Sequence, residues 1–177
     1  MNEAVFRDYR FDALRNALYH TARKSFLDFI NRVINFFVIV FGASVVGKTA
    51  GHFPFDGLYL ELATVIFATL QLVFDFGSKA RLHEFLQRRY YDLLSEMKND
   101  GSTDSKEQKK IFEKMLALAG EEPLTMRALD ALAYDQALDA LHNDPEIRLS
   151  HRQTISWWQK RFRNCFAFHS IDFQNRQ

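Results

Sequence analysis

The chain has 177 residues, which is enough for one domain or for one domain with a small appendage. Its net charge of +1 argues against a general nucleic-acid binder, so no direct nucleic-acid partner is expected. The single cysteine, Cys165, excludes an intramolecular disulfide, and the charged, amphipathic N-terminal thirty residues do not resemble a cleaved signal peptide.

Residues 8–32 are predicted to form an amphipathic helix. Its apolar residues recur at spacings of three and four, namely Phe11, Leu14, Leu18, Ala22, Phe26 and Phe29. No glycine or proline occurs between this pattern and Gly42. We therefore expect the helix to run without a break into the first long apolar stretch.

Two apolar stretches, Val33–Gly47 and Leu58–Phe74, lie close together, and only Glu61 interrupts the second. They predict an all-α protein built on a two-helix transmembrane hairpin, with spans at about residues 31–50 and 58–76. The alternative is a soluble or peripheral helical adaptor or scaffold protein, because the uncharged part of each stretch is shorter than the ~20 residues that a span usually needs.

Charge around the stretches predicts their orientation. Residues 1–32 hold six basic residues and Phe76–Lys98 holds five, whereas the connecting loop Lys48–Gly57 holds one. By the positive-inside rule, both flanking arms and both termini lie in the cytoplasm. The second arm continues an apolar pattern through Leu86, Tyr90, Leu93 and Met97, so we expect one unbroken helix from the second span to about residue 98.

A polar linker at residues 99–105 separates this hairpin region, residues 1–98, from a C-terminal helical region, residues 106–177. Helices are predicted at 106–119 and 124–142, with Pro123 and Pro145 in first helical turns. The segment that follows mixes aromatic and basic residues and predicts a tail at an anionic membrane surface. The tail residues are Trp157, Trp158, Lys160, Arg161 and Arg163. Packing of the tryptophans against the arms, and RNA binding, are the alternatives.

The segment Gly42–Thr49 (GASVVGKT) matches the phosphate-binding P-loop pattern, with Lys48 and Thr49 at the lysine and hydroxyl positions. A P-loop needs a helix that starts at the lysine, and here two glycines and Pro54 follow. Nothing else supplies the alternating strands and helices of a nucleotide-binding sheet. We therefore interpret the match as fortuitous, and a P-loop NTPase is the least favoured function.

The second stretch carries a polar stripe at spacings of three and four, formed by Glu61, Thr64, Ala68, Gln71 and Asp75. Such a stripe can line a polar path in an oligomer, or it can mark the two membrane interfaces and supply hydrogen bonds between helices. The small residues Ala43, Gly47 and Gly51 form a second stripe, on the first span, which would let two helices approach closely.

Six histidines are scattered along the chain, and none has metal-ligand spacing. No nucleophile motif is present, so no catalytic residue, metal or cofactor is predicted, and the protein is not expected to be an enzyme. His20 and His83 stand out because they lie on the two arms at similar distances from their spans. We expect them to lie near each other at the cytoplasmic end of the hairpin.

Leu18–Asp28 (LYHTARKSFLD) leads into a span that contains FGAS at 41–44, and the second span ends in LVFDF at 72–76. Ala80–Leu94 (ARLHEFLQRRYYDLL) then carries the most specific pattern, A-x-x-H-x-x-L-x-R-R. The order of these elements resembles the SLATT family, the SMODS- and SLOG-associating two-transmembrane effector domains of bacterial defence systems. The resemblance covers about residues 10–98.

The resemblance implies an oligomeric effector of the bacterial inner membrane that forms a pore or disrupts the bilayer during phage infection. Membrane lipid and further copies of the chain would be its partners. A sensor, or an enzyme that produces a nucleotide signal, would be encoded nearby and would trigger it. Family-pattern positions are His20, Arg23, Ala80, His83, Arg88 and Arg89, and the resemblance gives none of them a catalytic role.

Overall fold

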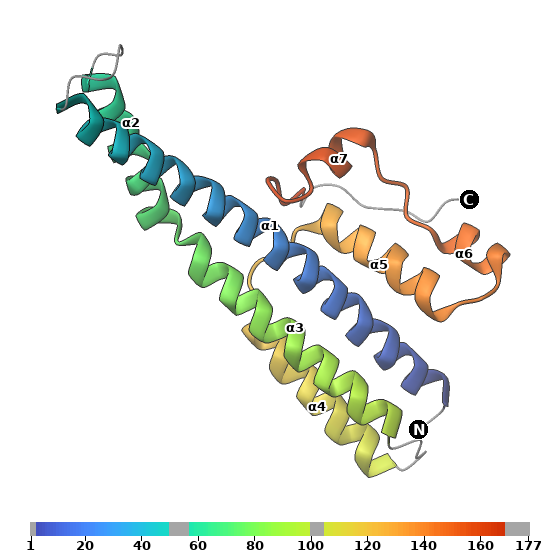
Figure 1. The fold of residues 1–177 in the computed structure, drawn as a ribbon. Coiled ribbons are helices and arrows are strands. Elements are labelled where there is room, and N and C mark those ends of the chain that lie inside the picture. The colour runs from blue at the N-terminus through green and yellow to red at the C-terminus, as the bar shows by residue number, and fades with distance from the viewer. Residues whose placement is uncertain (1–2, 50–56, 100–104, 169–177) are drawn as a thin grey trace. The chain divides into compact units, whose positions relative to one another are not determined.

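A computed structural model of the chain describes residues 3–49, 57–99 and 105–168. Helices follow one another throughout this part of the chain, in the order α1 to α7 (Figure 1). The prediction of an all-α fold is confirmed.

Helix α1, Glu3–Thr49, is a single helix of 47 residues, as the absence of an early glycine or proline predicts. Its last turns include Gly42–Thr49, the segment that matches the P-loop pattern. Within a helix the backbone N–H groups are bonded to carbonyls of the preceding turn, so they cannot form the open loop that cradles a phosphate.

The second arm is two helices, α2 (Gly57–Phe74) and α3 (Phe76–Asn99), so the prediction of one unbroken helix is wrong. Asp75 lies between them with φ of 40°, the left-handed conformation that aspartate tolerates better than most residues. Its Oδ1 accepts a hydrogen bond from the backbone N–H of Ser78 at 3.1 Å, which caps the start of α3.

Four shorter helices follow: α4 (Ser105–Glu121), α5 (Arg127–Leu141), α6 (Pro145–His151) and α7 (Trp157–Phe162). Pro145 occupies the first turn of α6, as predicted, and the Asp144 side chain caps this helix. Pro123 does not begin α5, which starts four residues later at Arg127. The intervening segment instead carries Glu122.

The chain forms two compact units. The helical unit comprises Met1–Arg23 and His83–Gln177, and the hairpin unit comprises Lys24–Leu82. This division differs from the predicted boundaries at residues 98 and 105, because the ends of α1 and α3 outside the hairpin pack with the C-terminal helices.

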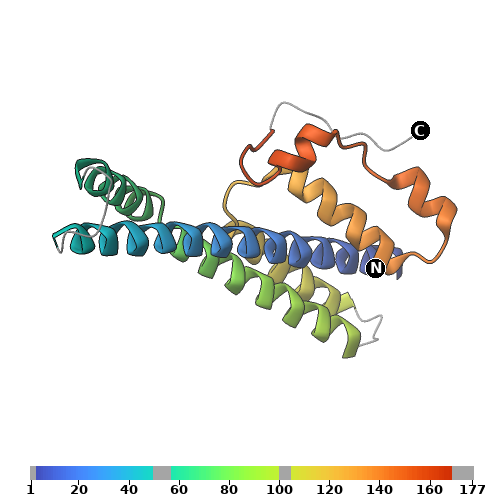
Figure 2. The same cartoon turned by 45° about the horizontal axis from the view of Figure 1, so that its top comes forward.

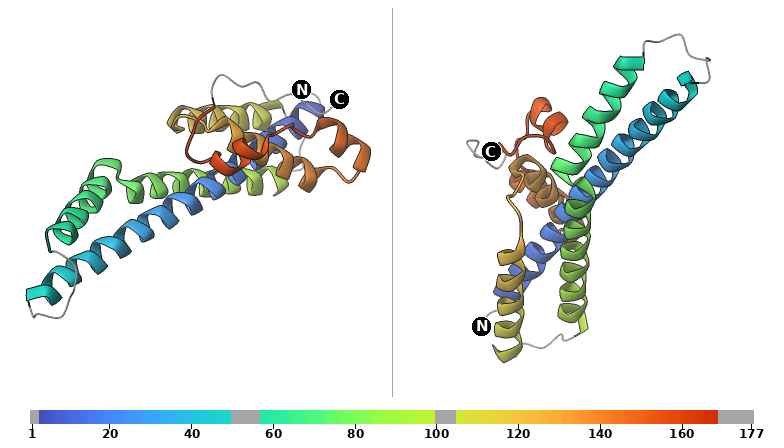
Figure 3. Two further views of the ribbon diagram at one scale, coloured as in Figure 1. Left: turned by 90° about the horizontal axis from the view of Figure 1, so that it is seen from above. Right: turned by 90° about the vertical axis from the view of Figure 1, so that its left-hand side faces the viewer.

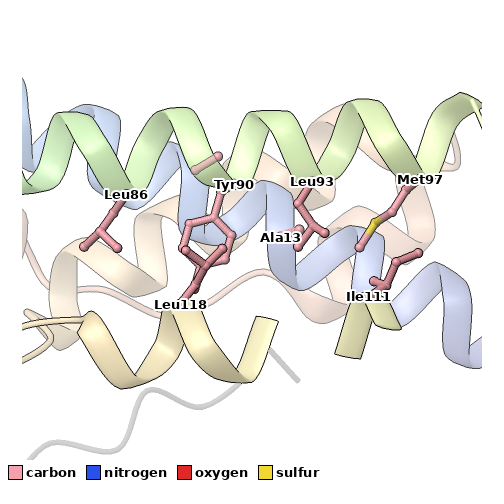
Figure 4. Packing of buried hydrophobic residues seen from close by; sticks show 8 residues of the cluster. Ala13, Leu86, Tyr90, Leu93, Met97, Ile111 and Leu118 are labelled. Carbon is pink, nitrogen blue, oxygen red and sulfur yellow. The ribbon is translucent and has the colours of Figure 1, made fainter. Parts of the chain in front are cut away.

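The helical unit has a core between α1, α3 and α4 (Figure 4). Helix α4 runs antiparallel alongside α3, as both views of Figure 3 show. The buried core residues are Ala13, Ala17, Leu86, Tyr90, Leu93, Met97, Ile111 and Leu118. On α1 and α3 they recur at helical spacing, so one apolar stripe of each helix faces the others.

Helix α5 packs on another side of α1, where Tyr19 meets Leu129 and Ala133. The Arg15 guanidinium, on α1, forms an ion pair with Asp130, and its Nε lies 2.7 Å from Oδ1. Helices α6 and α7 follow α5 in the chain (Figure 2, orange to red). Arg152, just after α6, pairs with Asp139 of α5 at 2.6 Å.

In the hairpin unit, α2 packs against the second half of α1. The Phe37 ring on α1 stacks on the Phe67 ring of α2 with centroids 5.1 Å apart, and the Phe41 ring lies tilted to Phe67 with centroids 5.6 Å apart. Gln71 Nε2 donates a hydrogen bond to Asn31 Oδ1 at 2.6 Å across the same interface. Most other large apolar side chains of this unit point outward. The exposed residues are Phe29, Phe36, Ile39, Val40, Leu58, Tyr59, Leu62, Val65, Ile66, Leu70, Leu72, Val73, Phe74 and Leu82.

Candidate functional site

Two histidines are buried side by side in the helical unit. His20 on α1 is 0% exposed, His83 on α3 is 4% exposed, and their Nδ1 atoms are 2.8 Å apart. The expectation that these two residues meet is confirmed. Each continues the core stripe of its helix, since His20 follows Ala13 and Ala17, and His83 precedes Leu86 and Tyr90. Helical periodicity therefore brings both imidazoles into the core.

A carboxylate and a phenol complete the cluster. Glu122, in the segment after α4, lies with its Oε1 3.3 Å from His20 Nε2, and it accepts a hydrogen bond from the Tyr90 hydroxyl at 2.5 Å. The rings of His20 and Tyr90 stack with centroids 5.8 Å apart. The cluster thus joins α1, α3 and the end of α4 through buried polar groups. Such groups stabilise a fold only when each of them has a hydrogen-bond partner.

The hydrogen bonds limit the protonation of the histidines. An ionised Glu122 can only accept, so His20 must carry a proton on Nε2. Only one proton fits between the two Nδ1 atoms, so one ring donates there and the other accepts. The two rings therefore cannot both be doubly protonated while this contact holds.

The electrostatic environment keeps His83 neutral. Burial lowers the pKa of His83 from 6.5 to about 4, helped by His20 and Arg23 and opposed by Glu122. Burial by itself raises the pKa of Glu122, but hydrogen bonds from His20 and Tyr90 outweigh it and place that pKa below its ordinary value. Burial and the bond to Glu122 raise the pKa of the Tyr90 hydroxyl. At neutral pH the cluster holds a neutral His83, a neutral phenol and a carboxylate.

The Tyr90 hydroxyl gives a direct test of the cluster. Replacing Tyr90 with Phe leaves the ring in the core but removes a donor to a charged acceptor, which should lower the free energy of unfolding by about 2 kcal/mol. Urea unfolding at neutral pH, followed by circular dichroism, measures the loss. Tyr91→Phe is the matched control, because Tyr91 is the next residue of α3 and is 41% exposed. Equal stability of the two variants would contradict a role for this hydrogen bond.

Sequence reasoning singled out the histidines but missed Glu122. It follows α4 directly and precedes Pro123, and its partner His20 lies 102 residues away along the chain. A charged residue next to a proline in a connection is ordinary in sequence. Nothing in its local pattern signals that its side chain enters the core.

The three arginines of the family pattern lie in two different parts of the helical unit. Arg23 Nη1 donates to the backbone oxygen of Asn164 at 2.5 Å and so ties α1 to the C-terminal segment. Arg88 is exposed and pairs with Glu84 one turn away at 2.5 Å, while the Arg89 guanidinium lies over the Phe85 ring at 5.7 Å. Arg23 therefore belongs near the histidine cluster, and Arg88 and Arg89 belong to the surface of α3.

The polar stripe of α2 divides in the structure. Gln71 faces α1 through its bond to Asn31, and the Thr64 hydroxyl donates to the carbonyl of Leu60 within α2 at 2.8 Å. Glu61 and Ala68 are exposed on the outside of the hairpin unit. Asp75 lies beyond the end of α2, so it is not part of the same helical stripe.

The small-residue stripe on α1 is described in part. Ala43 is exposed rather than packed against α2. Gly47 belongs to α1, but its surroundings, and the whole of Gly51, lie outside the described residues.

The aromatic and basic tail lies on the surface. Trp157 and Trp158 of α7 are 65% and 63% exposed, so the alternative in which they pack into the arms is wrong. Lys160, Arg161 and Arg163 are exposed beside them.

Within the described residues, no group of three or more His, Cys, Asp or Glu side chains is arranged to hold a metal ion. Two helical segments, within Val5–Ser44 and Leu58–Met97, are long and apolar enough to cross a membrane. Comparison of this chain with known protein families, with curated proteins and with solved structures finds no match.

Proposed function

We propose that this chain is a two-span membrane protein whose hairpin unit, Lys24–Leu82, lies in a lipid bilayer. The observation that carries the proposal is the exposure of the apolar side chains of this unit. In the most apolar 18-residue windows of its two arms, 11% and 0% of the residues are buried within the protein. Core helices of a soluble protein would be mostly buried, because each large apolar side chain left in water forgoes roughly 1.5–3 kcal/mol.

The flanking charge supports an orientation with the helical unit and both termini in the cytoplasm. The exposed tryptophans and cations of α7 suit the headgroup layer of an anionic membrane, where aromatic rings sit at the interface and cations meet lipid phosphates. With the resemblance to SLATT effectors, this points to the bacterial inner membrane.

In this membrane the protein acts as an oligomeric effector that opens or disrupts the bilayer when a partner sensor triggers it. An acidic side chain at membrane depth is costly and usually faces a partner or water. Glu61 and Ala68 lie on the outside of the hairpin unit, so contacts between copies of the chain would cover them. Gln71 belongs to the packing inside each hairpin, through Asn31.

Fractionation tests the membrane assignment. After gentle lysis and an alkaline wash, we expect the full chain to stay in the membrane pellet and to require detergent for release. A chain that dissolves in plain buffer as a monomer would contradict the proposal and favour the soluble adaptor.

Depolarisation tests the effector role. On induced expression, a membrane-potential dye should report loss of potential, and Glu61→Leu should reduce that loss at equal protein level. Asp92→Asn is the matched control, because Asp92 is an exposed acid of α3 outside the hairpin unit. Asp75 should be changed to Asn rather than Leu, since only the former tolerates the left-handed backbone there. Full depolarisation by the Glu61 variant would exclude the proposed contact face.

A further inference from the structure

A cavity of about 420 Å³ lies in the helical unit beside the histidine cluster. Its volume falls within the ~300–1,000 Å³ range of small-molecule sites. Aromatic rings from three helices line it, namely Tyr9, Tyr19, Tyr90 and Phe112. The rings of Tyr9 and Phe112 are 5.8 Å apart and form one wall.

The charged groups of the cavity are mainly acidic, since Asp12, Glu122 and Asp130 line it together with one guanidinium, that of Arg15. Two of the carboxylates already have partners. Asp130 is paired with Arg15, and Glu122 accepts from Tyr90. Asp12 forms no hydrogen bond or ion pair with any residue in the described part of the chain. Its carboxyl is half-buried, and burial raises its pKa.

We propose that this cavity binds a small organic ammonium ion, with the ammonium group at Asp12 and the apolar body against the rings. Asp12 shares the single Arg15 guanidinium with Asp130, so the cavity holds more carboxylate than cationic charge, and a bound cation restores the balance. Aromatic faces attract cations through their quadrupoles. Phosphates and carboxylates are excluded by the same charges, because they would meet the acidic groups of the cavity at short range.

The site is separate from the proposed membrane function, since all of its residues belong to the helical unit. It does share Tyr90 and Glu122 with the histidine cluster. A bound ammonium ion would therefore lie beside Tyr90 and Glu122, whose hydrogen bond helps to join α3 to the end of α4.

Three probes of nearly the same size and different charge test the proposal by calorimetry on the full chain in a non-ionic detergent. They are phenethylammonium, 2-phenylethanol and 3-phenylpropionate. We expect binding to be tightest for the cation, weaker for the neutral alcohol and weakest for the anion. Equal binding of all three, tighter binding of the anion, or no binding of the cation at millimolar concentration would overturn the proposal.

Two variants locate the site. Asp12→Asn should weaken phenethylammonium binding by about tenfold or more, because a charge-assisted hydrogen bond is lost, and should leave 2-phenylethanol unchanged. Phe112→Leu should weaken binding of phenethylammonium more than binding of 2-phenylethanol, because leucine keeps the apolar area but removes an aromatic ring face. Glu113→Gln, an exposed change on α4, is the matched control. Unchanged cation binding by Asp12→Asn would refute the assignment.

The Asp12 variant also has a readout without ligand. Removing a half-buried charge that only shares the Arg15 guanidinium with Asp130 should raise the melting temperature of the free protein, and added phenethylammonium should then stabilise the variant less than the unmodified chain. A lower melting temperature for the free variant would show that Asp12 serves the fold rather than a ligand.

Discussion

Acidification from about pH 7 to about pH 4 is expected to lower the free energy of unfolding of the helical unit by about 3 kcal/mol through His83 alone. The pKa of this residue is about 4 in the folded chain and 6.5 when unfolded. Between these values the unfolded chain binds a proton that the folded chain does not. The stabilisation is therefore complete above pH 6.5 and is lost as the pH falls toward 4.

Glu122 changes stability in the same direction at lower pH. Its folded pKa lies below the ordinary 4.5, so its contribution is present above that pH and is lost as the carboxylate is protonated in the fold. As the pH falls, the stabilisation from His83 is therefore lost first and the stabilisation from Glu122 is lost next.

Urea unfolding across this pH range, for the full chain in detergent, measures the effect. His83→Asn should flatten the profile between pH 4 and 6.5, because asparagine can occupy the Nδ1 hydrogen-bonding position but cannot become charged. His142→Asn, an exposed change at the end of α5, should keep the original slope. A slope that is the same in all three proteins would mean that His83 is not the titrating group.

Leu86→Ala is expected to cost about 3 kcal/mol of folding free energy, because it combines lost burial with a cavity. Leu86 is 0% exposed and lies in the core between α1, α3 and α4 (Figure 4). The neighbouring helices are fixed by other core contacts, so the space can close only in part.

Leu116→Ala provides the matched comparison, since Leu116 is on α4 and is 63% exposed. That change should alter stability by no more than about 0.5 kcal/mol. Thermal and urea unfolding by circular dichroism compare the two variants directly. If Leu86→Ala unfolds at the same urea concentration as Leu116→Ala, the core described for the helical unit is incorrect.

The local sequence pattern was sufficient to predict most of the helices. The long run without glycine or proline predicted the continuous α1, and the stripes at spacings of three and four predicted its core face. The same stripes placed His20 and His83 at corresponding heights on two antiparallel arms, so their approach could be expected before the structure. The helical period of each arm shows which face a residue lies on, and an antiparallel hairpin brings residues at equal distances from the turn to the same height.

The break at Asp75 depends on a single backbone conformation. Residues on both sides of it continue good helical patterns, and aspartate is compatible with a helix, with a cap and with a left-handed turn. The conformation that Asp75 adopts is decided by its cap at the start of α3, and the composition of the segment does not reveal it.

By itself, the sequence determined that the chain is helical, that two of its helices are apolar enough for a membrane, and that charge flanks them unequally. Only the tertiary structure decided that Glu122 reaches His20, that Gln71 bonds to Asn31, and that the tryptophans stay on the surface. Helix formation follows from interactions three or four residues apart, which sequence displays directly. Contacts between distant segments depend on how side chains of several helices fill a shared space, and no single segment encodes that.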